Sequence, residues 1–278
     1  MESAPNPIVV IVGQTASGKS ALGMKLAQQS VGSRGGEILC ADSRTIYREL
    51  DIGTAKPSAQ DRAMVPHHGL DLINLNERYS AAAFQCYGQA VIKDIHARGK
   101  LPIMVGGTGL YIDGLLYNFS FNTSDSTSKT NTTNSFDSTS TFNASEARVP
   151  TRQPLPPNVL IIGLKVDKEL LHQRIAERVD TMFEDGLLDE VQKVINVYGH
   201  DSNLPGLLAP GYKAVLQYID GKLTLSEAKQ LFIRNDMGLA KRQMTWFKRN
   251  SDIKWCTTEH QAYDNVRAFL QDFATIDT

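Results

Sequence analysis

Short apolar runs alternate with amphipathic segments along much of the chain. The runs have the length of strands, and their continuous apolar character is typical of strands buried on both faces of a sheet: residues 7–12, 37–41, 101–105 and 159–164. Segments with helical periodicity lie between or after them: residues 21–29, 81–98 and 169–197, the last broken near Gly186. Strands that alternate with helices predict an α/β fold, with a parallel sheet flanked by helices.

Two regions depart from this alternation. Residues 225–249 form a long helical segment with a basic run. Residues 118–148 are largely Ser, Thr and Asn, and they cannot bury enough apolar surface to offset the entropy lost on ordering. We therefore predict a first part of the core (1–117), a low-complexity, disordered insert (118–157), and a segment that completes the core and ends in a helical part (158–278). We also expect the insert to be dispensable for folding.

The first predicted strand runs directly into a phosphate-binding motif. The motif fits GxxxxGK[ST] between a strand and a helix, and it comprises Gly13, Gln14, Thr15, Ala16, Ser17, Gly18, Lys19 and Ser20. The glycines allow backbone N–H groups to surround phosphate oxygens, and the following helix adds its positive N-terminal dipole. Lys19 supplies a positive charge, and the Ser20 hydroxyl can hold Mg²⁺. The sequence thus predicts a P-loop NTPase-like fold with a phosphate site and a magnesium cofactor.

The ends of the other strands argue against an ordinary nucleoside triphosphatase. Such proteins usually carry an apolar strand that ends in an acidic residue, which organises Mg²⁺ and water. Here the run 101–105 ends in Gly-Gly-Thr-Gly, whereas the run 37–41 ends at Asp42. Ligands of open α/β folds lie at the carboxyl edge of the sheet, so Asp42 can act there as a general base or as the acceptor that selects an amino-bearing nucleophile. A helix cap is the structural alternative.

Composition narrows the class of partner. The 278 residues carry a formal net charge of -1 and the pI is near 6.6, so only a local basic patch can attract RNA. The cysteines are scattered and form no CxxC pair, which argues against a disulfide framework or a zinc site. The N-terminus lacks the features of a signal peptide, and no run approaches about 20 apolar residues, so we expect a cytoplasmic protein without a membrane span.

Longer motifs follow one another in a specific order. They are GQTASGKS (13–20), ADSRTIYRELDIGTAKP (41–57), VPHHGLDL (65–72), YSAAAF (79–84), LPIMVGGTGLYIDGLL (101–116), LHQRIAERVDTMFEDGLLDEV (171–191) and LAKRQMTWFK (239–248). This set resembles the tRNA dimethylallyltransferase (tRNA isopentenyltransferase) family, over residues 7–117 and 158–255. The resemblance implies transfer of a dimethylallyl group from dimethylallyl diphosphate to the N6 amine of the adenosine 3′ of the anticodon in tRNA, with the P-loop holding the diphosphate.

The resemblance also implies roles for individual residues. Asp42 matches the base or acceptor that faces the adenine N6, and Thr15 matches the residue that contacts the bridging oxygen of the diphosphate. Lys19 and Ser20 are implied as partners of the phosphates and Mg²⁺, and Arg178 as the arginine that neutralises the diphosphate. Without the resemblance, Arg178 is typical of a solvated helix charge. The positions implied to contact RNA are Asp42, Ser43, Arg44, Thr45 and Thr108.

Other conspicuous residues have structural alternatives. Lys241 and Arg242, with Trp246 nearby, are typical either of a phosphate-binding strip for RNA or of a solvated helix face. The pair His67–His68 lacks a convincing metal-ligand spacing, so we expect a structural or hydrogen-bonding role. Tyr111 is expected in the core.

The sequence departs from the family pattern after residue 117. Family members carry a helical insertion there, followed by a QRxxRALE-like motif that grips the anticodon stem, whereas this chain has the Ser/Thr/Asn tract. Pro210 also stands where the family usually has an apolar residue. We therefore expect a weaker hold on RNA.

The oligomeric state and the alternatives complete the expectations. We expect a monomer. Two alternative functions stay open: an adenylate isopentenyltransferase acting on free nucleotides, and a catalytically impaired RNA- or nucleotide-binding relative. A small-molecule kinase leaves the motifs at 41–57 and 239–248 unexplained.

Overall fold

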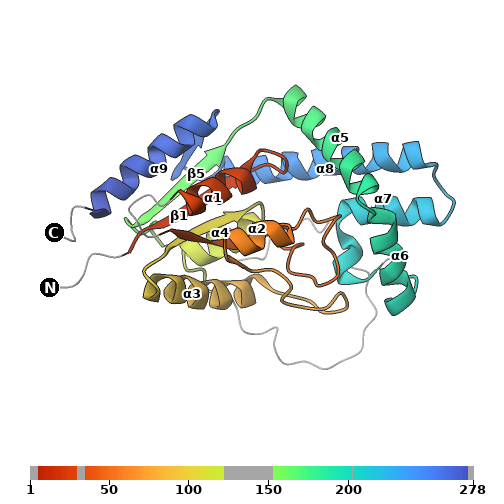
Figure 1. Ribbon diagram of the computed structural model, residues 1–278, viewed down its shortest axis with the longest axis horizontal. Coiled ribbons are helices and arrows are strands. Elements are labelled where there is room, and N and C mark those ends of the chain that lie inside the picture. Colours follow the sequence, from red (N-terminus) through yellow and green to blue (C-terminus); the bar gives the residue numbers. More distant parts are fainter. Residues whose placement is uncertain (1–5, 30–34, 122–152, 202, 275–278) are drawn as a thin grey trace.

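A sheet of six parallel strands forms the centre of the molecule (Figure 1). The computed structural model describes residues 6–29, 35–121, 153–201 and 203–274. The strands lie in the order β3-β2-β4-β1-β5-β6, and they are β1 (Ile8–Gly13), β2 (Gly36–Ala41), β3 (His67–His68), β4 (Leu101–Gly106), β5 (Val159–Leu164) and β6 (Ile253–Cys256). Each neighbouring pair of these strands is parallel, which confirms the predicted parallel sheet.

Helices cover both faces of the sheet. They are α1 (Lys19–Gln28) and α9 (Glu259–Ala274) on one face, and α3 (Ala81–Ala97) and α4 (Gly109–Leu116) on the other. Along β1, Val9 and Ile11 pack in the first layer, while Val10 and Val12 pack in the second. Because both faces are buried, β1, β4 and β5 carry apolar residues at successive positions instead of alternating with polar ones.

A helical module extends from one end of the sheet (Figure 1). It consists of α5 (Lys168–Glu184), α6 (Leu187–Tyr198), the 3₁₀ helix η2 (Pro205–Leu208), α7 (Pro210–Ile219) and α8 (Leu225–Phe247). Gly186, with a φ of 99°, separates α5 from α6 in a left-handed conformation that favours glycine. Helix α8 belongs to both parts: Phe232 packs among α5, α6 and α7, whereas Phe247 packs against the sheet. It therefore ties the module to the core.

The predicted strands and the long predicted helices are confirmed, including the break near Gly186. Several elements were not predicted individually: α2 (Ala59–Met64), β3, α4, η2, α7, β6 and α9. The strands β3 and β6 have two and four residues, which is too short to establish a period. The expectation for Tyr111 is confirmed, since its ring is buried and stacks on Phe84.

Two further expectations from the sequence concern the insert and the lack of a membrane span. Most of the predicted insert, residues 122–152, lies outside the described residues, so its disorder stays a prediction. Its two ends are described: Asn118 accepts a hydrogen bond from Gln85 (2.9 Å), and Leu155 packs on the core. Within the described ranges, no helix has the length and apolar character that a membrane crossing needs.

Candidate functional site

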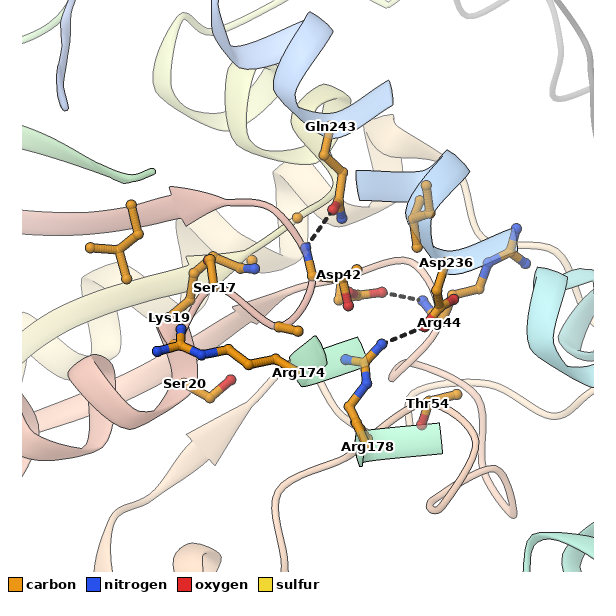
Figure 2. A pocket seen from close by; sticks show the side chains of 18 of the residues that line it. Ser17, Lys19, Ser20, Asp42, Arg44, Thr54, Arg174, Arg178, Asp236 and Gln243 are labelled. Carbon is orange, nitrogen blue, oxygen red and sulfur yellow. Dashed lines mark hydrogen bonds and ion pairs between the residues drawn. The ribbon is translucent and has the colours of Figure 1, made fainter. Parts of the chain in front are cut away.

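A cavity of about 1500 Å³ lies where the carboxyl ends of the strands meet the helical module. Its walls come from the P-loop, the turn after β2, the glycine turn after β4, and helices α5 and α8 (Figure 2). Most small-molecule pockets have about 300–1,000 Å³. This cavity is therefore large enough to bring two substrates together.

The P-loop has a backbone suited to an anion. A side chain at Gly13 would lie 2.8 Å from the Leu164 carbonyl oxygen, and Gly18 has a φ of 93°, so both positions favour glycine. Residues 15–20 line the cavity, and α1 begins within them, which places a helix N-terminus at the site. The Ser17 hydroxyl is buried and has no hydrogen-bond partner among the described residues. An anion at this loop would supply the missing acceptor.

Lys19 is held inside the loop. Its Nζ donates a hydrogen bond to the Gln14 carbonyl oxygen at 2.5 Å. Burial is the largest effect on its ionisation and lowers the pKa of Lys19 to about 8, with Asp42 raising the pKa and Arg178 lowering it. The ammonium group therefore lacks full compensation for its charge, which a bound diphosphate would provide.

Gln243 of α8 is a site residue that the sequence analysis missed. Its Oε1 accepts the backbone N–H of Thr15 at 2.7 Å, so this N–H is held by the protein. The Gln14 Nε2 donates to the Ala240 carbonyl oxygen at 3.3 Å, and Gly107 lies so close that a side chain there would clash with Gln243. Helix α8 thus fixes the first turn of the P-loop. The signal was present, since Gln243 falls on the buried face of this helix together with Ala240 and Phe247.

The turn after β2 carries Asp42 and the residues predicted to contact RNA except Thr108, which lies between β4 and α4. Asp42 Oδ1 accepts the backbone N–H of Arg44, and Thr108 Oγ1 accepts that of Ser43, both at 2.9 Å. No helix begins at this turn in the described chain, so the helix-cap alternative for Asp42 is wrong. The predicted residues all line the cavity: Asp42, Ser43, Arg44, Thr45 and Thr108.

Two arginines of α5 reach the cavity. Arg178 pairs with Asp236 of α8, and its Nε is buried without a partner among the described residues. Arg174, one turn earlier, also lines the cavity and points toward the P-loop side (Figure 2). Arg178 is therefore not a solvated helix charge. The sequence analysis missed Arg174, although its spacing of four residues from Arg178 places both on one helix face.

The loop 51–57 forms a further wall, and a buried glutamate of α6 fixes it. Glu190 accepts hydrogen bonds from the backbone N–H groups of Asp51 (2.7 Å), Ile52 (2.7 Å) and Gly53 (3.1 Å). Its Oε1 also accepts the hydroxyl of Tyr212 at 2.7 Å. Glu190 was not predicted as a site residue, because its partners in the loop are 137–139 residues away in the chain.

The basic strip of α8 lies only partly at the cavity. Arg242 lines it, whereas Lys241 is exposed and does not. Trp246 faces the fold, since its Nε1 donates to Asp113 at 2.8 Å. The aromatic neighbour predicted for this strip therefore serves packing.

The histidine pair has hydrogen-bond partners within the fold. His68 Nε2 lies 2.8 Å from Glu37 Oε2, and His67 Nδ1 lies 2.7 Å from the Val65 carbonyl oxygen. This confirms the predicted hydrogen-bonding role. Among the described residues, no group of three or more His, Cys, Asp or Glu side chains could hold a metal ion.

The fold and the cavity together define a class of protein. The P-loop with its lysine and two arginines of α5 face one cavity with Asp42, the carboxylate that follows β2 at the same edge of the sheet, which is the arrangement of a P-loop transferase with a phosphorylated donor. The chain belongs to the IPP transferase family, whose family model matches residues 45–141 and 133–250.

Individual relatives agree with this assignment. The chain is 37% identical to the tRNA dimethylallyltransferase of Pelotomaculum thermopropionicum, over 98% of this chain and 97% of the relative, and 38% identical to tRNA dimethylallyltransferase 1 of Citrifermentans bemidjiense, over 89% and 91%. It superposes on the tRNA isopentenylpyrophosphate transferase of Bacillus halodurans with a TM-score of 0.77 at 29% identity, covering 98% of this chain and 97% of that one. A eukaryotic dimethylallyltransferase acting on tRNA gives a TM-score of 0.77 at 25% identity, covering 98% and 80%.

Proposed function

We propose that this chain transfers a dimethylallyl group from dimethylallyl diphosphate to the N6 amine of the adenosine 3′ of the anticodon in tRNA. The observation that carries the proposal is that the P-loop, Asp42 and Arg178 share one cavity. Relatives that match nearly the whole chain are named for dimethylallyl transfer to tRNA, which favours tRNA over free adenylate as the acceptor. We expect the reaction to take place in the cytoplasm.

The P-loop side of the cavity suits the donor. When the bond between C1 of the dimethylallyl group and the diphosphate oxygen breaks, negative charge develops on the leaving diphosphate. Lys19, Arg178 and the backbone N–H groups at the start of α1 stabilise that charge, which is the electrostatic contribution that usually dominates catalysis. The Thr15 side chain contacts the bridging oxygen, while its backbone N–H stays bound to Gln243.

The Asp42 side of the cavity suits the acceptor. The adenine N6 forms a bond to C1 as the C1–O bond breaks, and the N6 proton passes to the Asp42 carboxylate. Because Arg44 holds one oxygen of this carboxylate through its backbone N–H, the carboxylate keeps a fixed orientation. The other residues on this wall, Ser43, Thr45 and Thr108, contact the RNA around the adenosine.

A magnesium ion fits this arrangement with few protein ligands. Ser20 lies at the start of α1 and lines the cavity, so its hydroxyl can serve as one ligand. Mg²⁺ keeps several waters and commonly takes its remaining ligands from substrate phosphates. In this proposal Ser20 would hold the ion, which would offset negative charge on the leaving diphosphate.

The test separates the donor side from the acceptor side. Asp42→Asn should lower transfer to an anticodon stem-loop by about 10²–10³ while retaining donor binding, because it removes the proton acceptor only. Lys19→Ala should weaken donor binding, measured by equilibrium dialysis with labelled dimethylallyl diphosphate. Lys25→Ala removes a lysine from the same helix outside the cavity and is the matched control. Near-normal turnover of Asp42→Asn would rule out the role given to that carboxylate.

A further inference from the structure

Arg178 and Asp236 form an ion pair between α5 and α8 in the wall of the cavity (Figure 2). The Asp236 side chain is 7% exposed and that of Arg178 is 27% exposed. Burial raises the pKa of Asp236 above its ordinary value, against the opposing effect of Arg178. The buried carboxylate therefore depends on this arginine to stay ionised.

The guanidinium of Arg178 uses only part of its donor capacity. Among the described residues, Asp236 is the side chain that it binds, through Nη2, and its Nε is buried without a partner. An arginine offers donors in a fixed planar fork, so holding one edge orients the others. An anion that accepted a hydrogen bond from Nε would satisfy this unpaired donor of Arg178.

A second cavity offers the same arginine another position. This cavity has a volume of about 360 Å³, and loop 51–57 and α5 line it. Arg178 lies in its wall as well, together with Lys56, Arg62 and the carboxylates of Asp51 and Asp185. Asp51 pairs with Lys56 at 2.6 Å, so Asp185 is the carboxylate there that can attract a guanidinium not held elsewhere. Asp236 therefore decides whether the Arg178 guanidinium lies in the main cavity or in the second cavity.

We infer that Asp236 is a positioning residue, which holds the Arg178 guanidinium in the main cavity so that its remaining donors serve the diphosphate of the substrate. The inference rests on the proposed function, in which Arg178 binds that diphosphate. On charge alone, Asp236 would oppose an anionic ligand, because both are negative. As a positioning residue it promotes binding. The two effects have opposite signs, so the direction of change in a variant separates them.

The experiment measures the affinity of inorganic diphosphate and of dimethylallyl diphosphate by titration calorimetry. Asp236→Ala should weaken both by about 10- to 100-fold, the loss typical of a hydrogen bond to a charged group. Arg178→Ala should lose at least as much, and the double variant should be no weaker than Arg178→Ala, because the two residues act as one unit. Asp236→Asn keeps an acceptor oxygen and should bind within about threefold of the unchanged protein.

A second ion pair provides the matched control. Lys229 and Asp180 join the same two helices at 2.7 Å, and neither lines the main cavity or the second cavity. Asp180→Ala should leave both affinities unchanged, whereas a merely structural role for Asp236 would make the two alanine variants alike. In steady-state assays, Asp236→Ala should raise the KM for dimethylallyl diphosphate and leave the KM for RNA unchanged.

Clear outcomes would overturn the inference. Tighter or unchanged diphosphate binding by Asp236→Ala would show that the carboxylate acts only through its charge. Additive losses in the double variant would show that Asp236 does not act through Arg178. If the unchanged protein binds diphosphate but does not prenylate RNA, the proposed function fails, while the calorimetric comparison still decides the role of Asp236.

Discussion

The ammonium group of Lys19 donates to the Gln14 carbonyl oxygen within the P-loop. Burial, as the largest effect, lowers its pKa to about 8, and the neighbouring Arg178 adds to the lowering while Asp42 opposes it. In the free protein, Lys19 is therefore charged at neutral pH and loses its charge as the pH rises through about 8. A bound diphosphate favours the charged form and raises the pKa again.

At the residue scale, we predict that kcat/KM for dimethylallyl diphosphate falls as the pH rises through about 8. The reason is that kcat/KM reports the ionisation of the free enzyme, and neutral Lys19 gives the diphosphate no opposing charge. The fall in kcat should come at higher pH, because the donor is then bound. Lys19→Arg should move the fall in kcat/KM upward, since its guanidinium stays charged to about pH 12. A kcat/KM that is flat between about pH 7 and pH 10 would contradict this account.

The residues that could be predicted differ from the others in how far apart their partners lie in the chain. The P-loop is built from consecutive residues, so its motif alone indicates the phosphate site. Gln243 binds Thr15, and Asp236 binds Arg178, across separations of 228 and 58 residues. Only the packing of α8 against the P-loop and against α5 brings these partners together, and no local pattern contains that information.

At the element scale, Glu190 joins α6 to loop 51–57 and to Tyr212 of α7. This carboxylate fixes the start of the loop through successive backbone N–H groups, and the buried Lys56 side chain fixes its end by donating to the Tyr47 carbonyl oxygen and pairing with Asp71. Gly53 lies directly against the Tyr212 ring, where any side chain would clash. The wall of the cavity formed by this loop thus depends on the helical module.

We predict that Glu190→Gln lowers the free energy of unfolding by about 2–4 kcal/mol, because its amide turns a donor toward the partly buried backbone donors of the loop or toward the buried Tyr212 hydroxyl. Tyr212→Phe removes one of the hydrogen bonds and should cost about 1 kcal/mol. Asp189→Asn changes the exposed neighbour on the same helix and should stay within about 0.5 kcal/mol. Urea denaturation of the variants is the measurement. Equal stabilities of Glu190→Gln and Asp189→Asn would show that the hydrogen bonds of Glu190 do not hold loop 51–57 in place.

At the scale of the whole molecule, α8 links the two sources of the site. The sheet supplies the P-loop and Asp42, and the helical module supplies Arg178 and its partner. The alternation of strands and helices was sufficient to predict β1, β2, β4 and β5, because each lies in a largely apolar run, whereas β3 and β6 lack such a run. The position of the module relative to the sheet could not be predicted, since it depends on long-range contacts of α8 with both parts.

The central claim is that this single cavity joins a prenyl diphosphate to an adenine presented by RNA. The most direct measurement compares the specificity constants for an anticodon stem-loop and for AMP, with labelled dimethylallyl diphosphate, across a salt titration. We predict that the stem-loop is preferred and that its advantage shrinks with salt, by a log–log slope of about 0.7 for each phosphate contact in a single strand. A preference for AMP, or a ratio that does not change with salt, would contradict the account.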